Sequence, residues 1–137
     1  MVAKTGRKLD VGRVFEFSIM QDANKSPEIL AAYTAPFPDE QHKAGAATFP
    51  LLVPVNEDDP GAAKLREARE ALKTWDKPAL VMFSDMDPIT GGDRFFRKII
   101  PTAKDQPEIT IHGAGHFLQE EGGVEIAGHV LDFMARS

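Results

Sequence analysis

Cysteine is absent from this sequence of 137 residues. The chain can therefore form no disulfide, and it carries neither a thiolate nucleophile nor a cysteine-based zinc site. Histidine is scarce, with four residues at positions 42, 112, 116 and 129. His112 and His116 are four residues apart, but the glycines between them oppose the helix that would place both rings on one face. We therefore expect no metal site.

Long apolar runs are missing too. No stretch approaches the roughly 18 to 20 apolar residues that span a bilayer, and charged residues stand where a signal peptide would have its apolar core. The formal net charge is −5, and the one short basic cluster, residues 4–8, contains no aromatic side chain. We expect neither membrane insertion nor nucleic-acid binding, and a cytoplasmic location.

The remaining composition is that of a folded protein. Apolar residues make up 42% of the chain and charged residues 27%, which is ordinary for a globular domain. The length suits one domain or a piece of one. There are no internal repeats.

The predicted elements change in character along the chain. Up to residue 77 the sequence predicts short helices broken by prolines. One of these starts at Ser26. Another, opened by Asp58, Asp59 and Pro60, carries an apolar stripe that ends at Trp75, which we expect to pack in the core. The apolar residues 49–54 should also pack on another surface. Residues 11–20 fit either a helix or a strand.

Beyond residue 77 the pattern is that of an α/β fold. A continuous apolar run at residues 79–83 predicts a buried strand. The elements that follow are a loop at 88–92, a helix at 95–100, a strand at 108–112 and a terminal helix around 126–134. Alternation of strands and helices in this order is typical of a parallel sheet covered by helices.

Polar side chains follow both predicted strands. Asp85 and Asp87 come after the first strand, and His116 follows the second. Groups at the carboxyl ends of parallel strands converge, so an acid and a histidine in this order match the last two members of a hydrolase triad. A carboxylate on one ring nitrogen fixes the tautomer, while the other nitrogen serves as a base. Alternatively, the aspartates only cap the turn and His116 has no catalytic role.

Three stretches resemble the haloalkane dehalogenases of the α/β-hydrolase superfamily. They are Phe-Ser-Asp-Met-Asp-Pro-Ile-Thr at 83–90, Gly-Ala-Gly-His-Phe-Leu-Gln-Glu at 113–120, and Ala-Tyr-Thr-Ala-Pro-Phe-Pro-Asp at 32–39. The resemblance implies the C-terminal part of an α/β-hydrolase fold. Residues 1–54 would be the remainder of the helical cap with its return segment. Residues 55–137 would be part of the main domain, with its last two parallel strands.

By this resemblance Asp87 is the triad acid and His116 the base, with Asp85 as the alternative acid. In the family an aspartate attacks the carbon that bears the halogen, and the histidine activates the water that hydrolyses the resulting ester. The resemblance implies a halogenated alkane as substrate and no cofactor. The nucleophile motif, Gly-x-Asp-x-Gly in this family and Gly-x-Ser-x-Gly in esterases, is absent. We therefore expect no turnover by the chain alone.

Two other hypotheses stay open. An epoxide hydrolase uses the same logic but needs tyrosine donors in the cap, and Tyr33 is the only tyrosine. A non-catalytic interaction module would expose its sheet edge or its apolar loop to a partner. Because two strands leave an unpaired edge and an uncovered apolar face, we expect the isolated chain to fold poorly or to self-associate through that edge.

Overall fold

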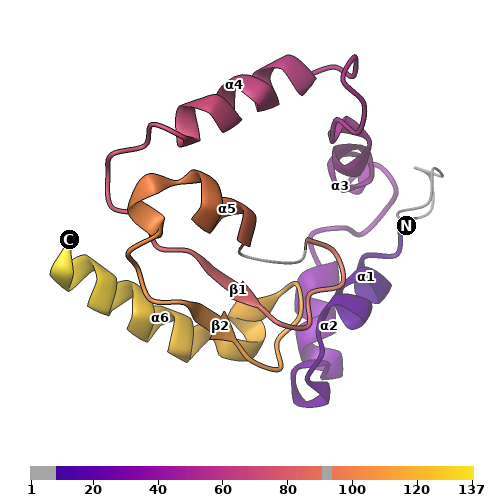
Figure 1. Ribbon diagram of the computed structural model, residues 1–137. Coiled ribbons are helices and arrows are strands. Elements are labelled where there is room, and N and C mark those ends of the chain that lie inside the picture. The colour runs from indigo at the N-terminus through magenta and orange to yellow at the C-terminus, as the bar shows by residue number, and fades with distance from the viewer. Residues whose placement is uncertain (1–8, 91–93) are drawn as a thin grey trace.

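The computed structural model describes residues 9–90 and 94–137 (Figure 1). The basic cluster at residues 4–8 and the end of the loop predicted at 88–92 lie outside the described residues. The elements, in chain order, are α1 (Val11–Ser18), η1 (Asp22–Asn24), α2 (Pro27–Thr34), α3 (Ala44–Thr48), η2 (Phe49–Leu52), α4 (Ala62–Leu72), β1 (Met82–Ser84), α5 (Arg94–Ile99), η3 (Pro101–Ala103), β2 (Ile109–Ile111) and α6 (Leu118–Arg136), where η denotes a 3-10 helix.

α1 and α2 form a packed pair beside one end of the sheet (Figure 1). The carboxylate of Asp10 accepts the N–H of Arg13 at 3.1 Å and caps α1. The hydroxyl of Ser26 accepts the N–H of Ile29 at 3.3 Å, and Pro27 occupies the first turn of α2, where a missing N–H costs nothing. The helix start predicted at Ser26 is confirmed, and residues 11–18 are helical.

β1 and β2 form a parallel sheet in which Met82 pairs with Ile109 and Ser84 with Ile111. α5 and η3 carry the chain from β1 to β2, and α6 packs against β2 (Figure 1). The predicted order of strand, helix, strand and helix is confirmed. Each strand has three residues, fewer than the apolar runs predicted, because only these residues find a ladder partner.

A small core lies beside the sheet. Val81, Ile100 and Ala103 are buried together, and partly buried side chains of Leu72 and Phe83 pack against them. On the other side of the sheet, Ile111 is buried where α6 lies on β2. These contacts fix the two strand ends from which the candidate site is built.

Several apolar side chains are exposed, contrary to prediction. Phe49, Leu52 and Val55 are 74%, 64% and 83% exposed, and Trp75 is 40% exposed. The predictions that residues 49–54 pack on another surface and that Trp75 packs in the core are therefore wrong for this chain. A two-stranded sheet with its helices offers too little apolar surface to cover them.

α4 also begins later than predicted. Asp59 does not cap the helix, because its carboxylate accepts the N–H groups of Val55 and Asn56, each at 2.8 Å. Gly61 then adopts a left-handed conformation with φ of 87°, and the helix starts at Ala62. Within the described part of the chain, no helix is both long and apolar enough to cross a membrane.

Candidate active site

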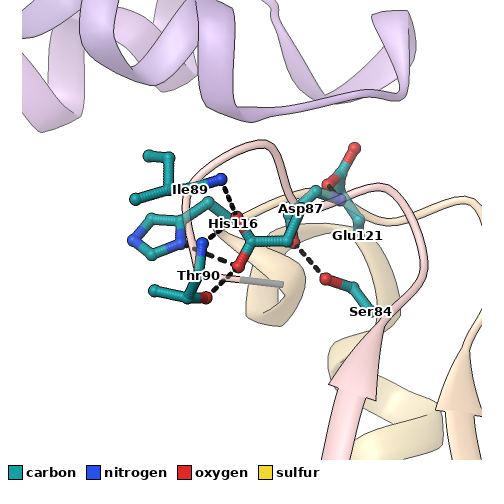
Figure 2. A network of polar contacts seen from close by, with 7 residues as sticks. Ser84, Asp87, Ile89, Thr90, His116 and Glu121 are labelled. Atoms are coloured by element: carbon teal, nitrogen blue, oxygen red, sulfur yellow. Dashed lines mark hydrogen bonds and ion pairs between the residues drawn. The ribbon is translucent and has the colours of Figure 1, made fainter. Parts of the chain in front are cut away.

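An aspartate and a histidine meet at the carboxyl ends of the two strands (Figure 2). Asp87 lies in the loop after β1 and His116 in the loop after β2, and His116 Nδ1 is 3.1 Å from Asp87 Oδ2. An ionised carboxylate only accepts hydrogen bonds, so Nδ1 carries a hydrogen in this contact, and in a neutral imidazole Nε2 would then be the acceptor. The side chain of Asp87 is 6% exposed and that of His116 is 31% exposed. In this pair the imidazole is therefore partly exposed to solvent, and the carboxylate is buried.

The carboxylate of Asp87 is held by its own loop. It accepts the N–H of Ile89 at 2.7 Å, the N–H of Thr90 at 3.2 Å, and the Thr90 hydroxyl. Burial disfavours the charged carboxylate, but these bonds and the bond from His116 outweigh it, and they lower the pKa of Asp87 from 3.8 to about 2. The acid is therefore ionised at neutral pH.

Asp85, the alternative acid, faces a different histidine. Its carboxylate lies 2.9 Å from His112 Nδ1 and accepts the N–H of Gly113 at 2.8 Å. The hydrogen bond from His112 is the main reason that the pKa of Asp85 lies below 3.8. This pair is on the surface, with His112 80% and Asp85 38% exposed. Of the two candidate acids, Asp87 is therefore the one that contacts His116.

The loop that carries His116 is fixed to the end of β1 and to α1. The Ser84 hydroxyl donates to the carbonyl of Gly115 at 2.7 Å, and the N–H of Met86 donates to the carbonyl of Ala114 at 3.1 Å. The N–H of His116 donates to the carbonyl of Ser18 at 2.9 Å. A Cβ at Gly115 would lie 2.3 Å from that same carbonyl oxygen, so only glycine allows this approach.

Glu121 is a polar residue of this region that the sequence analysis did not single out. From the first turn of α6 it accepts the N–H of Gly115 at 2.6 Å, that of Met20 at 2.6 Å and that of Gln21 at 2.5 Å. In the sequence, Glu121 is recognisable only as an acid near the start of a helix, which is a common feature. That feature does not reveal hydrogen-bond partners about 100 positions away.

Aromatic rings link the histidine loop to the two N-terminal helices. Phe117 stacks on Phe15 with ring centroids 4.0 Å apart, and Phe15 stacks on Tyr33 at 3.8 Å. The rings of His116 and Phe117 pack edge to face, with their centroids 5.3 Å apart. Such contacts contribute about 0.5–1.5 kcal/mol each beyond their burial. The orientation of His116 therefore depends on α1 and α2 as well as on the sheet.

An apolar cavity of about 350 Å³ opens between the N-terminal helices and η2. Phe15 and Tyr33 line it as well as belonging to the aromatic stack, but Asp87 and His116 do not line it. Its lining residues are Leu9, Val11, Val14, Phe15, Ala32, Tyr33, Pro36, Phe37, Ala46 and Pro50.

In residues 9–90 and 94–137, no group of three or more His, Asp or Glu side chains is arranged to hold a metal ion.

Comparison with known proteins finds curated relatives of this chain. No family model matches the chain. A curated haloalkane dehalogenase of Psychrobacter cryohalolentis is 49% identical over 110 residues, which are 80% of this chain and 36% of that protein. Haloalkane dehalogenase 1 of Mycobacterium bovis is 43% identical over 126 residues, which are 91% of this chain and 41% of that protein. The chain is homologous to part of the haloalkane dehalogenases. The predicted resemblance is confirmed.

Solved structures of haloalkane dehalogenases share the fold. The tetrameric enzyme DpaA of Paraglaciecola agarilytica NO2 superposes with a TM-score of 0.76 and 27% identity, over 89% of this chain and 40% of that chain. The enzyme DatA of Agrobacterium tumefaciens C58 gives a TM-score of 0.71 over 92% of this chain and 43% of that chain. The fold is therefore part of an α/β-hydrolase fold, as predicted. The chain spans about 36 to 41% of the length of the curated dehalogenases described above.

Proposed function

We propose that this chain supplies the general base and its supporting acid, His116 and Asp87, to a haloalkane dehalogenase that converts halogenated alkanes to alcohol and halide. The observation that carries the proposal is the contact of 3.1 Å between His116 Nδ1 and Asp87 Oδ2 at the ends of two parallel strands. In this proposal residues 1–54 belong to the helical cap, and residues 55–137 belong to the main domain.

The proposed reaction has two steps. A carboxylate nucleophile outside this chain attacks the carbon bearing the halogen, so a carbon–oxygen bond forms and the halide leaves with the electrons of the broken bond. Water then attacks the carbonyl carbon of the ester while His116 Nε2 takes its proton. Asp87 stabilises the resulting imidazolium. Collapse of the intermediate transfers the proton from His116 to the leaving alkoxide and gives the alcohol and a carboxylic acid, which releases its proton to solvent to regenerate the carboxylate.

The chain requires a complement for this chemistry. Gly-x-Asp-x-Gly, the motif that holds the nucleophile in the family, is absent from the sequence. The exposed apolar side chains of Phe49, Leu52 and Val55 support the same requirement, since contiguous exposed apolar residues mark interaction surfaces. We therefore propose that the isolated chain releases no halide.

Halide release from an assembled pair tests the proposal. The chain is co-expressed with a dehalogenase segment that supplies the other strands and the nucleophile, and halide is measured with a halogenated alkane. We expect release by the pair and by neither part alone. His116→Ala should lower the rate by at least about 100-fold, the usual contribution of a general base.

His112→Ala is the matched control for that substitution. His112 also contacts an aspartate through Nδ1, at 2.9 Å, but its side chain is 80% exposed. We expect this variant to retain its activity. A pair that is folded and assembled yet releases no halide would contradict the proposal, as would equal loss of activity in the two variants.

A non-catalytic interaction module is the second candidate, favoured by the exposed apolar side chains at residues 49–55. It predicts a discrete folded complex with a partner that His116→Ala leaves unchanged. The epoxide hydrolase alternative has less support, because the hydroxyl of Tyr33 donates to Glu120. Diol formation from an epoxide, measured with the same assembled pair, separates the two hydrolase readings.

A further inference from the structure

Glu121 joins two segments that are far apart in the sequence. One carboxylate oxygen accepts the N–H groups of Met20 and Gln21, at 2.6 and 2.5 Å, and the other accepts the N–H of Gly115 at 2.6 Å. All three bonds are made to a partly buried side chain. Bonds to an ionised carboxylate are stronger than neutral ones, so this is a firm connection.

The connection holds the residue immediately before His116. Gly115 N–H is bound by Glu121, and the next N–H, that of His116, is bound by the Ser18 carbonyl at 2.9 Å. Ser18 lies two residues before Met20, whose N–H is also bound by Glu121. The same carboxylate thus fixes both sides of the contact between the histidine loop and the end of α1. In Figure 2, Glu121 lies on one side of Asp87 and the ring of His116 lies on the other.

We propose that Glu121 is a positioning residue for His116, acting through the backbone of residue 115 to keep the imidazole on Asp87. The inference rests on the proposed role of His116 as the base, because only then does its orientation matter for turnover. Ser84 provides the second restraint, since its hydroxyl donates to the Gly115 carbonyl at 2.7 Å. The N–H of Gly115 is therefore bound by Glu121, and its carbonyl is bound by Ser84.

A carboxylate suits this position better than an amide of the same shape. Both oxygens of Glu121 act only as acceptors, and each faces at least one N–H donor. In Glu121→Gln one of these oxygens becomes an NH₂ group, which would face a backbone N–H and leave that donor unsatisfied. The substitution therefore breaks the connection on one side while changing the side-chain volume little.

The tautomer of His116 reports its position directly. We would record imidazole ¹⁵N shifts of the whole chain at about pH 9, where imidazoles are ordinarily neutral. In the wild-type chain the Asp87 carboxylate should hold His116 as the Nδ1–H tautomer. In Glu121→Gln we expect a mixture with the Nε2–H tautomer, and amide exchange of Gly115 about tenfold faster or more. A role in stability alone would leave the tautomer of the folded protein unchanged.

Glu125→Gln is the matched control. Glu125 lies one turn further along α6, its side chain is 53% exposed, and its Oε1 lies 3.7 Å from His129 Nε2. The control should keep the wild-type tautomer and exchange rates. If Glu121→Gln keeps the Nδ1–H tautomer while folded, the inference is wrong.

A measurement on the wild-type chain covers the case in which the variant does not fold. The amide protons of Met20, Gln21 and Gly115 should exchange slowly and as a group, because one carboxylate holds them. Rapid exchange at these three sites would also overturn the inference. A folded wild-type pair that holds His116 as the Nδ1–H tautomer yet releases no halide would instead contradict the proposed function.

Discussion

Asp87 combines two roles that the sequence analysis treated as alternatives. It closes the turn after β1 by accepting the N–H groups of Ile89 and Thr90, and it also contacts His116. The turn holds the carboxylate in one orientation, so the histidine meets a preorganised acceptor. The bonds that shape the loop are also those that keep the acid ionised.

The low pKa of Asp87 predicts a specific dependence of stability on pH. The pKa in the folded state lies below the unfolded value, so the ionised side chain stabilises the fold. This contribution is complete above about pH 5 and is lost as the pH falls toward the folded value of about 2. The shift from 3.8 to about 2 corresponds to about 2 kcal/mol.

Asp87→Asn should therefore destabilise the chain by about 2 kcal/mol near neutral pH, with a smaller difference in acid. The asparagine resembles the protonated acid, so the two proteins converge as Asp87 takes up its proton. Urea unfolding of both proteins at several pH values measures this difference. Asp85→Asn is the control, and its effect should be smaller because Asp85 is 38% exposed. A difference that stays constant with pH would contradict the assignment.

At the scale of elements, α6 can lie on β2 because of one glycine. A Cβ at Gly122 would lie 2.5 Å from the Cγ2 atom of Ile111, which is 1% exposed. Gly122 also departs from helical geometry, with φ of −130° and ψ of 20°. The helix therefore bends where it crosses the strand, and its first turn, with Glu121, reaches the histidine loop.

Gly122→Ala should destabilise the chain by about 1–3 kcal/mol, because α6 must move away from β2 to admit the methyl group. Gly128→Ala is the control in the same helix, since nothing lies within 4 Å of a Cβ there. That variant should be up to about 1 kcal/mol more stable, owing to the higher helix propensity of alanine. Thermal unfolding of the two variants and the wild type checks both signs. Similar shifts for both glycines would show that packing on Ile111 is unimportant.

The elements also show how far the sequence could predict this structure. The strands and the loops of Asp87 and His116 were predictable, because apolar runs and turn residues are local signals. Glu121 was not, since its partners Met20 and Gln21 lie about 100 positions away. The core prediction for Trp75 failed for a related reason. An apolar stripe shows that a face seeks cover, but not that the chain itself provides it.

At the scale of the whole molecule, exposed apolar surface is the dominant feature. The side chains of Phe49, Leu51, Leu52, Val53 and Val55 are between 57% and 83% exposed, and they are nearly contiguous along the chain. Contiguous exposed apolar surface is uncommon on soluble monomers and favours association. The two-stranded sheet adds unpaired strand edges. We therefore predict that the chain self-associates when it has no other partner.

The combined substitution Leu51→Glu and Leu52→Glu should reduce this association. Both side chains are largely exposed, at 57% and 64%, so the folded chain loses few contacts, while charges at an apolar interface would be costly to bury. In sedimentation experiments the wild-type mass should rise with concentration above 15.0 kDa, and the variant should stay near that value. Val124→Glu, at a side chain that is 92% exposed on α6, is the control and should behave as the wild type. A wild-type chain that is monomeric at every concentration would contradict the prediction, and a double variant that still associates would move the interface to the sheet edge.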